Sequence, residues 1–288
     1  MISPIQKRAA GTLLLLALLI LLLPRAAAGQ RPSVRDGWIP MLHRSYLGFD
    51  TNLYPGDKML PALRKHFAYL GYWLNDPPGT HTNEWVGKRA TVRKAGFGFL
   101  ILFNGRLDKQ LRRTDPAALG SADGAAAAHA AKTEGFPPKA IIFLDLEEGG
   151  RMLPEQLAYI GAWIRAVRAV GYRVGIYCAG IPFHDSGQTL STADDIVAHF
   201  PGTAIWTAND KCPPAPGCVA RPIRPSRSEF KDALVWQFSQ SPRRRSLTRA
   251  CAKTYARDGN CYAPGMPHTE RTALDLDSST SPDPSHGR

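Results

Sequence analysis

The sequence lacks the residue patterns that usually bind metal ions. Its five cysteines include no Cys-x-x-Cys pair, and its eight histidines include no pair at the spacing of metal ligands. These absences argue against a zinc site and against a metal-dependent sugar deacetylase, which needs paired histidines. The chain also has no internal repeat and no basic-aromatic pattern typical of nucleic-acid binding. We therefore expect no metal, no cofactor and no nucleic-acid partner.

The amino terminus has the three parts of a secretory signal. Lys7 and Arg8 precede an apolar run from Leu13 to Leu23, and three alanines follow at 26–28. The run is shorter than the roughly 20 apolar residues that span a bilayer. We expect cleavage after Ala28 and a secreted, periplasmic or cell-envelope protein, with an uncleaved membrane anchor as the alternative.

The chain is basic, and its mature part has the size of a single domain. The net charge is +12, and removal of Lys7, Arg8 and Arg25 with the signal lowers it to +9. In an exported protein such a surface suits anionic glycans, wall polymers or anionic lipid head groups, although a general contribution to solubility is an equal alternative. About 260 mature residues fit one barrel-sized domain, which we expect to be monomeric.

Export permits disulfide bonds. Cys212 and Cys218 flank a loop rich in proline and glycine, and Cys251 and Cys261 bracket a polar segment. Pairing each cysteine with its near neighbour is the simplest arrangement, although the sequence leaves the connectivity open. Cys178 follows an apolar run without a signature for an activating histidine, so we expect a buried free thiol rather than a nucleophile.

Short apolar runs alternate with helical segments along most of the chain. Amphipathic or alanine-rich segments at 84–95, 123–134, 154–170 and 194–200 predict helices. The apolar runs are continuous, as is typical of strands buried on both faces of a parallel sheet. They lie at 46–50, 67–74, 97–103, 140–147, 173–178, 203–207, 233–238 and 273–276.

After the sixth run, the segments 209–231 and 240–272 are rich in proline, arginine and cysteine and predict no helix. We therefore predict an α/β fold: a TIM-like barrel of five β/α units followed by three strands with long, disulfide-stapled loops. The expected organisation is a signal peptide at 1–28, an N-terminal lead at 29–45, the barrel at 46–278 and a disordered tail at 279–288.

Acidic residues stand at the expected carboxyl ends of the strands, where the active sites of such barrels form. Asp145 and Glu147 are two residues apart on the strand at 140–147, so we expect both carboxylates to face the mouth and Leu146 to face the helices. Adjacent carboxylates do not ionise independently; one that keeps its proton can protonate a leaving glycosidic oxygen, while its ionised neighbour stabilises positive charge. A structural network of carboxylates held by cations or backbone donors is the alternative. Asp50 and Asp275, on the first and last strands, would adjoin when the barrel closes.

Aromatic residues also stand near these strand ends. Tyr177, Trp206 and Trp236, together with the polar Gln237, could line a cleft for sugar rings. Each aromatic residue alone is more often part of a core. Beside four acids at the same end of a barrel, a carbohydrate cleft becomes the better interpretation.

Taken in order, these motifs resemble a known group of proteins. They are Gly48-Phe49-Asp50, Phe143-Leu144-Asp145-Leu146-Glu147, Gly175-Ile176-Tyr177, Ile205-Trp206-Thr207-Ala208, Val235-Trp236-Gln237-Phe238 and Leu274-Asp275-Leu276. The set is similar to the skeleton of glycoside hydrolase family 25 lysozymes. It is closer still to their bacterial relatives, a glycoside hydrolase-like TIM-barrel family of formerly unknown function. Those relatives begin with Gly-Phe-Asp and end the second strand in a step like Tyr72-Trp73-Leu74.

The resemblance implies a secreted hydrolase of peptidoglycan or another N-acetylated glycan that uses no metal. It implies that Glu147 is the general acid/base, that Asp145 orients or stabilises the reacting N-acetyl group, and that Asp50 and Asp275 complete the acidic site. We assign Tyr72, with the residues of the aromatic cleft, to substrate binding.

The lysozymes carry a Tyr-His pair on the third strand, where this chain has Leu102-Phe103-Asn104. Glu147 favours an enzyme, whereas the missing histidine favours a non-catalytic protein that binds cell-wall glycan through the same cleft.

Overall fold

The structure of the protein is a computed structural model that describes residues 44–209, 222–240 and 274–288. The chain divides into the units Met1–Ile39 and Pro40–Arg288, and all described residues belong to the second. The predicted signal peptide and the four cysteines expected to form disulfides lie outside the described residues. In the three ranges above, no helix combines the length and the apolar character needed to cross a membrane.

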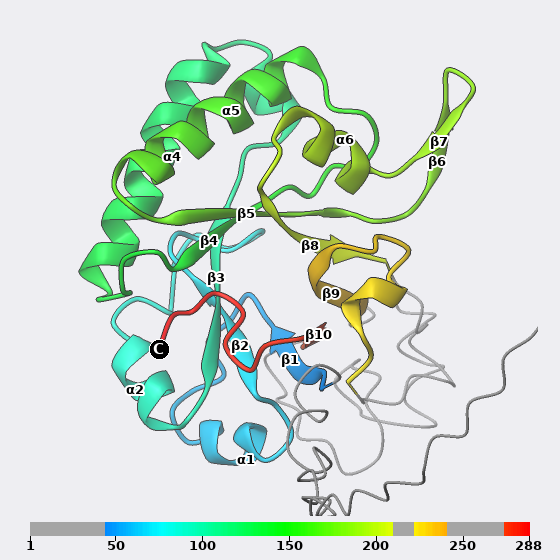
Figure 1. The fold of residues 1–288 in the computed structure, drawn as a ribbon. Coiled ribbons are helices and arrows are strands. Elements are labelled where there is room, and N and C mark those ends of the chain that lie inside the picture. The colour runs from blue at the N-terminus through cyan, green and yellow to red at the C-terminus, as the bar shows by residue number, and fades with distance from the viewer. Residues whose placement is uncertain (1–43, 210–221, 241–273) are drawn as a thin grey trace, which may run out of the picture. The chain divides into compact units, whose positions relative to one another are not determined.

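Eight strands close into a barrel in the order β1-β10-β9-β8-β5-β4-β3-β2 (Figure 1). The prediction of an α/β barrel is therefore confirmed. The strands are β1 (Tyr46–Asp50), β2 (Tyr69–Trp73), β3 (Gly98–Asn104), β4 (Ile141–Asp145), β5 (Arg173–Ala179), β8 (Ala204–Ala208), β9 (Ala233–Ser239) and β10 (Asp275–Ser279).

The last strand departs from the prediction in position and direction. Neighbouring strands from β1 round to β9 are parallel, whereas β10 is antiparallel to both β1 and β9. The sequence predicts a strand at 273–276, with its acids at the carboxyl end of a parallel sheet. An apolar run carries no information on direction. Because β10 runs the other way, its first residue, Asp275, reaches the mouth of the barrel.

Helices follow the first five barrel strands and cover the outside of the sheet (Figure 1). A small antiparallel hairpin, which the sequence analysis does not predict, separates β5 from the last of these helices. The helices are α1 (Leu60–Arg64), α2 (Arg89–Lys94), α3 (Asp108–Leu111), α4 (Pro116–Thr133), α5 (Pro154–Ala169) and α6 (Thr192–His199), the hairpin is β6 (Phe183–Asp185) and β7 (Gln188–Leu190), and a 3-10 turn, η2 (Pro225–Arg227), precedes β9.

The two longest helices, α4 and α5, pack backbone against backbone. Asp115 caps α4, because its carboxylate accepts hydrogen bonds from the amides of Ala117 and Ala118. A side chain at Gly120 or Gly124 would overlap the main chain of α5, so the close contact requires glycine at both positions.

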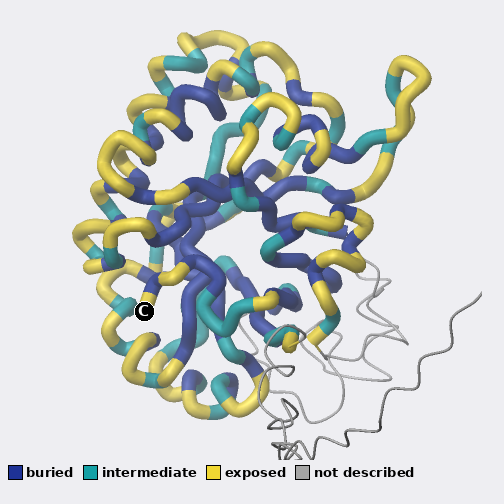
Figure 2. The backbone as a smooth tube through the Cα atoms, viewed as in Figure 1, coloured by how far each residue is buried: buried dark blue, intermediate teal, exposed yellow. Residues whose placement is uncertain are grey.

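Large aromatic side chains fill the interior of the barrel. The barrel strands are largely buried, and most exposed residues lie in the helices, the loops and the hairpin around them (Figure 2). A side chain at Gly48 would overlap the ring of Tyr69, and one at Gly175 would overlap the ring of Phe143. These two glycines therefore leave room for rings that close the barrel below the mouth. Cys178 is a buried free thiol, as predicted, and burial raises its pKa.

The prediction of a disordered tail at 279–288 is wrong. Ser279 belongs to β10, and the residues after it pack against the amino-terminal ends of β3 and β4. The backbone of Ser285 donates to Phe99 O and accepts from Ile141 N, and Ser285 Oγ accepts from Ile101 N at 2.8 Å. The tail is polar and rich in proline, which suggests disorder, but its hydrogen-bonding groups serve strand ends that the sheet leaves unpaired.

We expect Ser285→Ala to lower the free energy of unfolding by about 1–3 kcal/mol, because the buried amide of Ile101 loses its acceptor. Urea titration of the mature protein measures this change. Thr280→Ala, at an exposed position of the same segment, serves as the control and should leave stability unchanged. Equal stability of the two variants would contradict the role assigned to Ser285.

Candidate functional site

Carboxylates from three barrel strands and one loop surround the hydroxyl group of Tyr177. Asp50 ends β1 and is the cross-strand partner of Asp275, which begins β10. Asp145 ends β4, and Glu147 follows it in the next loop. Burial raises the pKa of Tyr177, and the charges of Asp145, Asp50, Glu147 and Asp275 raise it further. The four acids singled out in the sequence therefore lie near enough to Tyr177 for their charges to act on its hydroxyl group.

A chain of hydrogen bonds links Tyr177 to Asp50. The Tyr177 hydroxyl donates to Gln237 Oε1 at 2.8 Å, and Gln237 Nε2 donates to Asp50 Oδ2 at 2.8 Å. Gln240 Nε2 also donates to Gln237 Oε1, at 2.9 Å. These bonds fix the orientation of the Gln237 amide, which then holds one oxygen of Asp50 in place.

Asp145 and Glu147 lie in different environments. Strand β4 ends at Asp145. The prediction that Glu147 is a second residue of the same strand is therefore wrong. Asp145 is buried, whereas Glu147 is exposed. Burial, the charge of Glu147 and the charge of Asp50 hold the pKa of Asp145 well above its usual value. Among the described residues, Asp145 Oδ1 has no hydrogen-bond partner. Asp145 thus keeps its proton to a higher pH than an ordinary aspartate.

A fifth acid, Asp277, belongs to the same cluster. It is fully buried, and its Oδ1 accepts a hydrogen bond from Trp206 Nε1 at 3.0 Å. Burial, the charge of Asp50 and the contact between the two carboxyl groups raise the pKa of Asp277 well above its usual value. Asp277 is not among the site residues predicted from the sequence. It stands two residues after Asp275 on one strand, so both side chains point to the same face, which is the signal for its place in the cluster.

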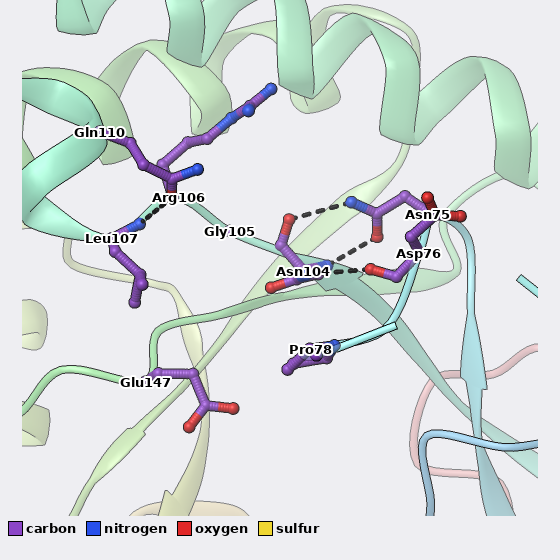
Figure 3. A pocket seen from close by; sticks show the side chains of 10 residues that line it. Asn75, Asp76, Pro78, Asn104, Gly105, Arg106, Leu107, Gln110 and Glu147 are labelled. Carbon is purple, nitrogen blue, oxygen red and sulfur yellow. Dashed lines mark hydrogen bonds between the residues drawn. The ribbon is translucent and has the colours of Figure 1, made fainter. Parts of the chain in front are cut away.

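The exposed Glu147 lies on the wall of a polar cleft of about 540 Å³ (Figure 3). Asn75 closes one side, because its amide both donates to Asn104 O and accepts from Asn104 N. The side-chain amide of Asn104 donates to Asp76 O at 2.9 Å. The lining residues follow β2, β3 and β4: Asn75, Asp76, Pro78, Gly79, Asn104, Gly105, Arg106, Leu107, Gln110 and Glu147.

Asp145 and Asp277 have no cationic partner among the described residues. Arg106 lines the cleft, but its guanidinium makes two hydrogen bonds, of 2.7 and 2.8 Å, with the carboxylate of Asp123. Between the described residues, no salt bridge joins a lysine or arginine to Asp145 or Asp277. The same residues contain no group of three or more potential ligands arranged to hold a metal ion. Asp145 and Asp277 thus reduce their charge by holding protons, in keeping with their raised pKa values.

Three aromatic residues expected to line a sugar cleft lie elsewhere. Trp206 is buried beneath the acids, with its ring centroid 4.3 Å from that of Tyr177. Trp236 is also buried, and its indole donates to Asn209 O. Tyr72 lies between the barrel and α4, where its hydroxyl donates to Glu134 Oε2 at 2.6 Å.

The alternation of side chains along a strand explains why Trp236 and Tyr72 lie away from the acids. Trp236 and Tyr72 are next to Gln237 and Gly71, and Gly71 is the position on β2 that approaches Asp50. Adjacent residues of a strand point to opposite faces, so these two rings point away from the acids. Aromatic character alone predicted a cleft, because the prediction did not take into account which face of its strand each side chain occupies.

Comparison with known proteins agrees with this geometry. Residues 73–213 match the family model of the Rv2525c-like, glycoside hydrolase-like domain. About half of the chain, including β3, β4 and Glu147, is thus similar to a glycoside hydrolase-like domain. A search of curated proteins found no match.

Several solved structures are similar to this chain at low sequence identity. An uncharacterized protein of B. stearothermophilus is 16% identical, with 81% of this chain and 94% of that chain covered and a TM-score of 0.50. The Tat-secreted protein Rv2525c of Mycobacterium tuberculosis, in complex with HEPES, is 15% identical (83% and 96% covered, TM-score 0.47). The bacterial lysozyme of Streptomyces coelicolor is 12% identical (82% and 92% covered, TM-score 0.44).

The buried acids should make the glycoside hydrolase-like domain less stable as the pH rises. Because the pKa of Asp277 is raised by folding, the folded state binds its proton more tightly, and stability falls as the pH increases above about 4. We expect Asp277→Asn to raise the Tm at pH 7.5, by about 2–4 °C for each kcal/mol gained, and to change it less at pH 5.

Thermal unfolding followed by circular dichroism across this pH range measures the effect. Asp232→Asn, at an exposed aspartate, is the control. Parallel curves of Tm against pH for the wild type and Asp277→Asn would contradict the assignment of a raised pKa.

Proposed function

We propose that the protein hydrolyses glycosidic bonds in peptidoglycan or another N-acetylated glycan of the cell envelope. The observation that carries the proposal is the pair of unlike carboxyl groups at the mouth of the barrel. Glu147 is exposed on a cleft, and the buried Asp145 beside it has a raised pKa. Two carboxyl groups in unlike environments are what acid/base cleavage of a glycosidic bond requires. The match of residues 73–213 to a glycoside hydrolase-like family model supports the same reaction class.

In the proposed reaction, Glu147 protonates the glycosidic oxygen of the departing sugar and afterwards takes a proton from the attacking water. Asp145 hydrogen-bonds to the N-acetyl group of the substrate and orients it. Asp50 and Asp275 stabilise the positive charge that develops on the reacting sugar. Tyr177 and Gln237 hold Asp50 in position through their hydrogen bonds.

The proposed site of action is the cell envelope, which the protein would reach through the amino-terminal signal. The net charge of +9 that remains without the signal suits a location among anionic wall polymers or at an anionic membrane surface.

A second candidate function is glycan binding without hydrolysis. The observation that favours it is Asn104, which stands where the lysozymes that the sequence resembles carry a histidine. Its side-chain amide is already engaged with Asp76 O and transfers no proton at neutral pH. A binding protein would keep the cleft and its affinity for glycan but release no reducing ends.

We expect Glu147→Gln to lower the release of reducing ends from peptidoglycan or N-acetylated oligosaccharides by about 10²- to 10⁴-fold, the usual contribution of a general acid/base. Binding of the same glycans should change little, because the amide keeps the shape of the carboxyl group. Reducing-end assays and calorimetry measure the two properties separately.

Glu148→Gln is the matched control. Glu148 is adjacent in sequence, but its carboxylate accepts from Asp108 N and from Gln156 Nε2, in the direction of α3 and α5. Equal activity of the wild type and Glu147→Gln would exclude the role of Glu147. Glycan binding without release of reducing ends by the wild type would leave the binding protein as the function.

A further inference from the structure

The hairpin β6–β7 projects from the barrel at the carboxyl end of β5 (Figure 1). Its turn residues, Ser186 and Gly187, have φ angles of 49° and 78°, as a tight two-residue hairpin turn requires. Most of the hairpin is exposed (Figure 2). An isolated pair of strands is marginally stable, so its position depends on contacts with the barrel.

Arg151 connects the hairpin to the loop that carries Glu147. Its guanidinium pairs with Asp185 of β6 through Nε and with Asp195 of α6 through Nη1, at 3.2 Å. Asp195 is buried, and its other oxygen accepts from the amide of Met152 at 2.8 Å. The hairpin and the loop after β4 are therefore held to the same buried carboxylate.

The order of the strands puts the hairpin and the cleft on opposite sides of Glu147. The cleft is lined by residues that follow β2 and β3, Glu147 follows β4, and the hairpin follows β5. A glycan that runs from the cleft past Glu147 next meets the segment after β5. An enzyme that cuts within a polymer must bind sugars on both sides of the cleaved bond. The cleft provides a binding site on one side of Glu147.

One face of the hairpin is suited to this contact. Asp185, Phe183 and Gln188 share a face, because His184 pairs with Thr189 and alternate residues point to opposite sides. Asp185 contacts Arg151, so this face is turned toward the loop of Glu147. Phe183 is half-buried and Gln188 is exposed. A ring surface and a free amide together fit a neutral, hydroxyl-rich chain.

We propose that the face of the hairpin with Phe183 and Gln188 binds the part of the glycan chain that lies beyond Glu147, on the side away from the cleft. This inference rests on the proposed function for its ligand. It extends the site to a polymer, with one part in the cleft and the other on the hairpin.

The test measures binding of short and long N-acetylglucosamine oligosaccharides, and of insoluble peptidoglycan, in the Glu147→Gln background. We expect Gln188→Ala to weaken binding of the long chains about three- to tenfold, the usual contribution of one hydrogen bond, and to leave the short chains unchanged. Phe183→Ala should weaken binding of the long chains more than Gln188→Ala does. Gln188 is exposed, so its replacement does not threaten folding.

Thr189→Ala and His184→Ala, on the opposite face of the same hairpin, are the controls and should bind both lengths as the parent does. Equal binding of long chains by the parent and Gln188→Ala would overturn the proposal, as would losses of the same size on both faces. Hydrolysis by the wild type with no effect at Gln188 would reject only the hairpin. Loss of long-chain binding at Gln188 in a protein that releases no reducing ends would reject only the hydrolysis.

Discussion

The antiparallel pairing of β10 with β1 is the constraint on which the site depends. It closes the barrel and brings Asp275 beside Asp50, although 225 positions separate them in the sequence. It also puts Asp277 below them, against the indole of Trp206. If β10 were parallel to its neighbours, its first residue would lie at the opposite end of the barrel. The acidic cluster thus follows from the direction of one short strand.

Burial of the acids has an energetic cost that is most easily explained by function. Neither Asp145 nor Asp277 has a lysine or arginine partner among the described residues, and burial raises the pKa of both. A group that must hold its proton against solvent destabilises the fold as the pH rises. A purely structural network would more often contain a cation, as the pair Arg106 and Asp123 does on the outside of this barrel.

The sequence predicts the strands better than the directions of individual side chains. The first strand matches its predicted limits, and the acids at strand ends were found because carboxylates are rare in apolar runs. Tyr72 and Trp236 were misassigned because aromatic residues serve a core and a cleft equally well. The cleft was missed because Asn75 stands in a polar loop, where asparagine is ordinary, and Asn104 is the polar last residue of an apolar strand. Only the register of β2 and β3 brings these two residues together.

The loop after β4 explains how Glu147 can be exposed and still be held in place. Glu148 binds the amide of Asp108 on one side, and Gly150 exchanges hydrogen bonds with the hydroxyl of Thr192 on the other. The amide of Met152 binds the buried Asp195. Each anchor uses a neighbour of Glu147 rather than Glu147 itself. The backbone is therefore fixed from both sides while the carboxyl group faces the cleft, the condition under which an exposed acid can act on a ligand at a defined position.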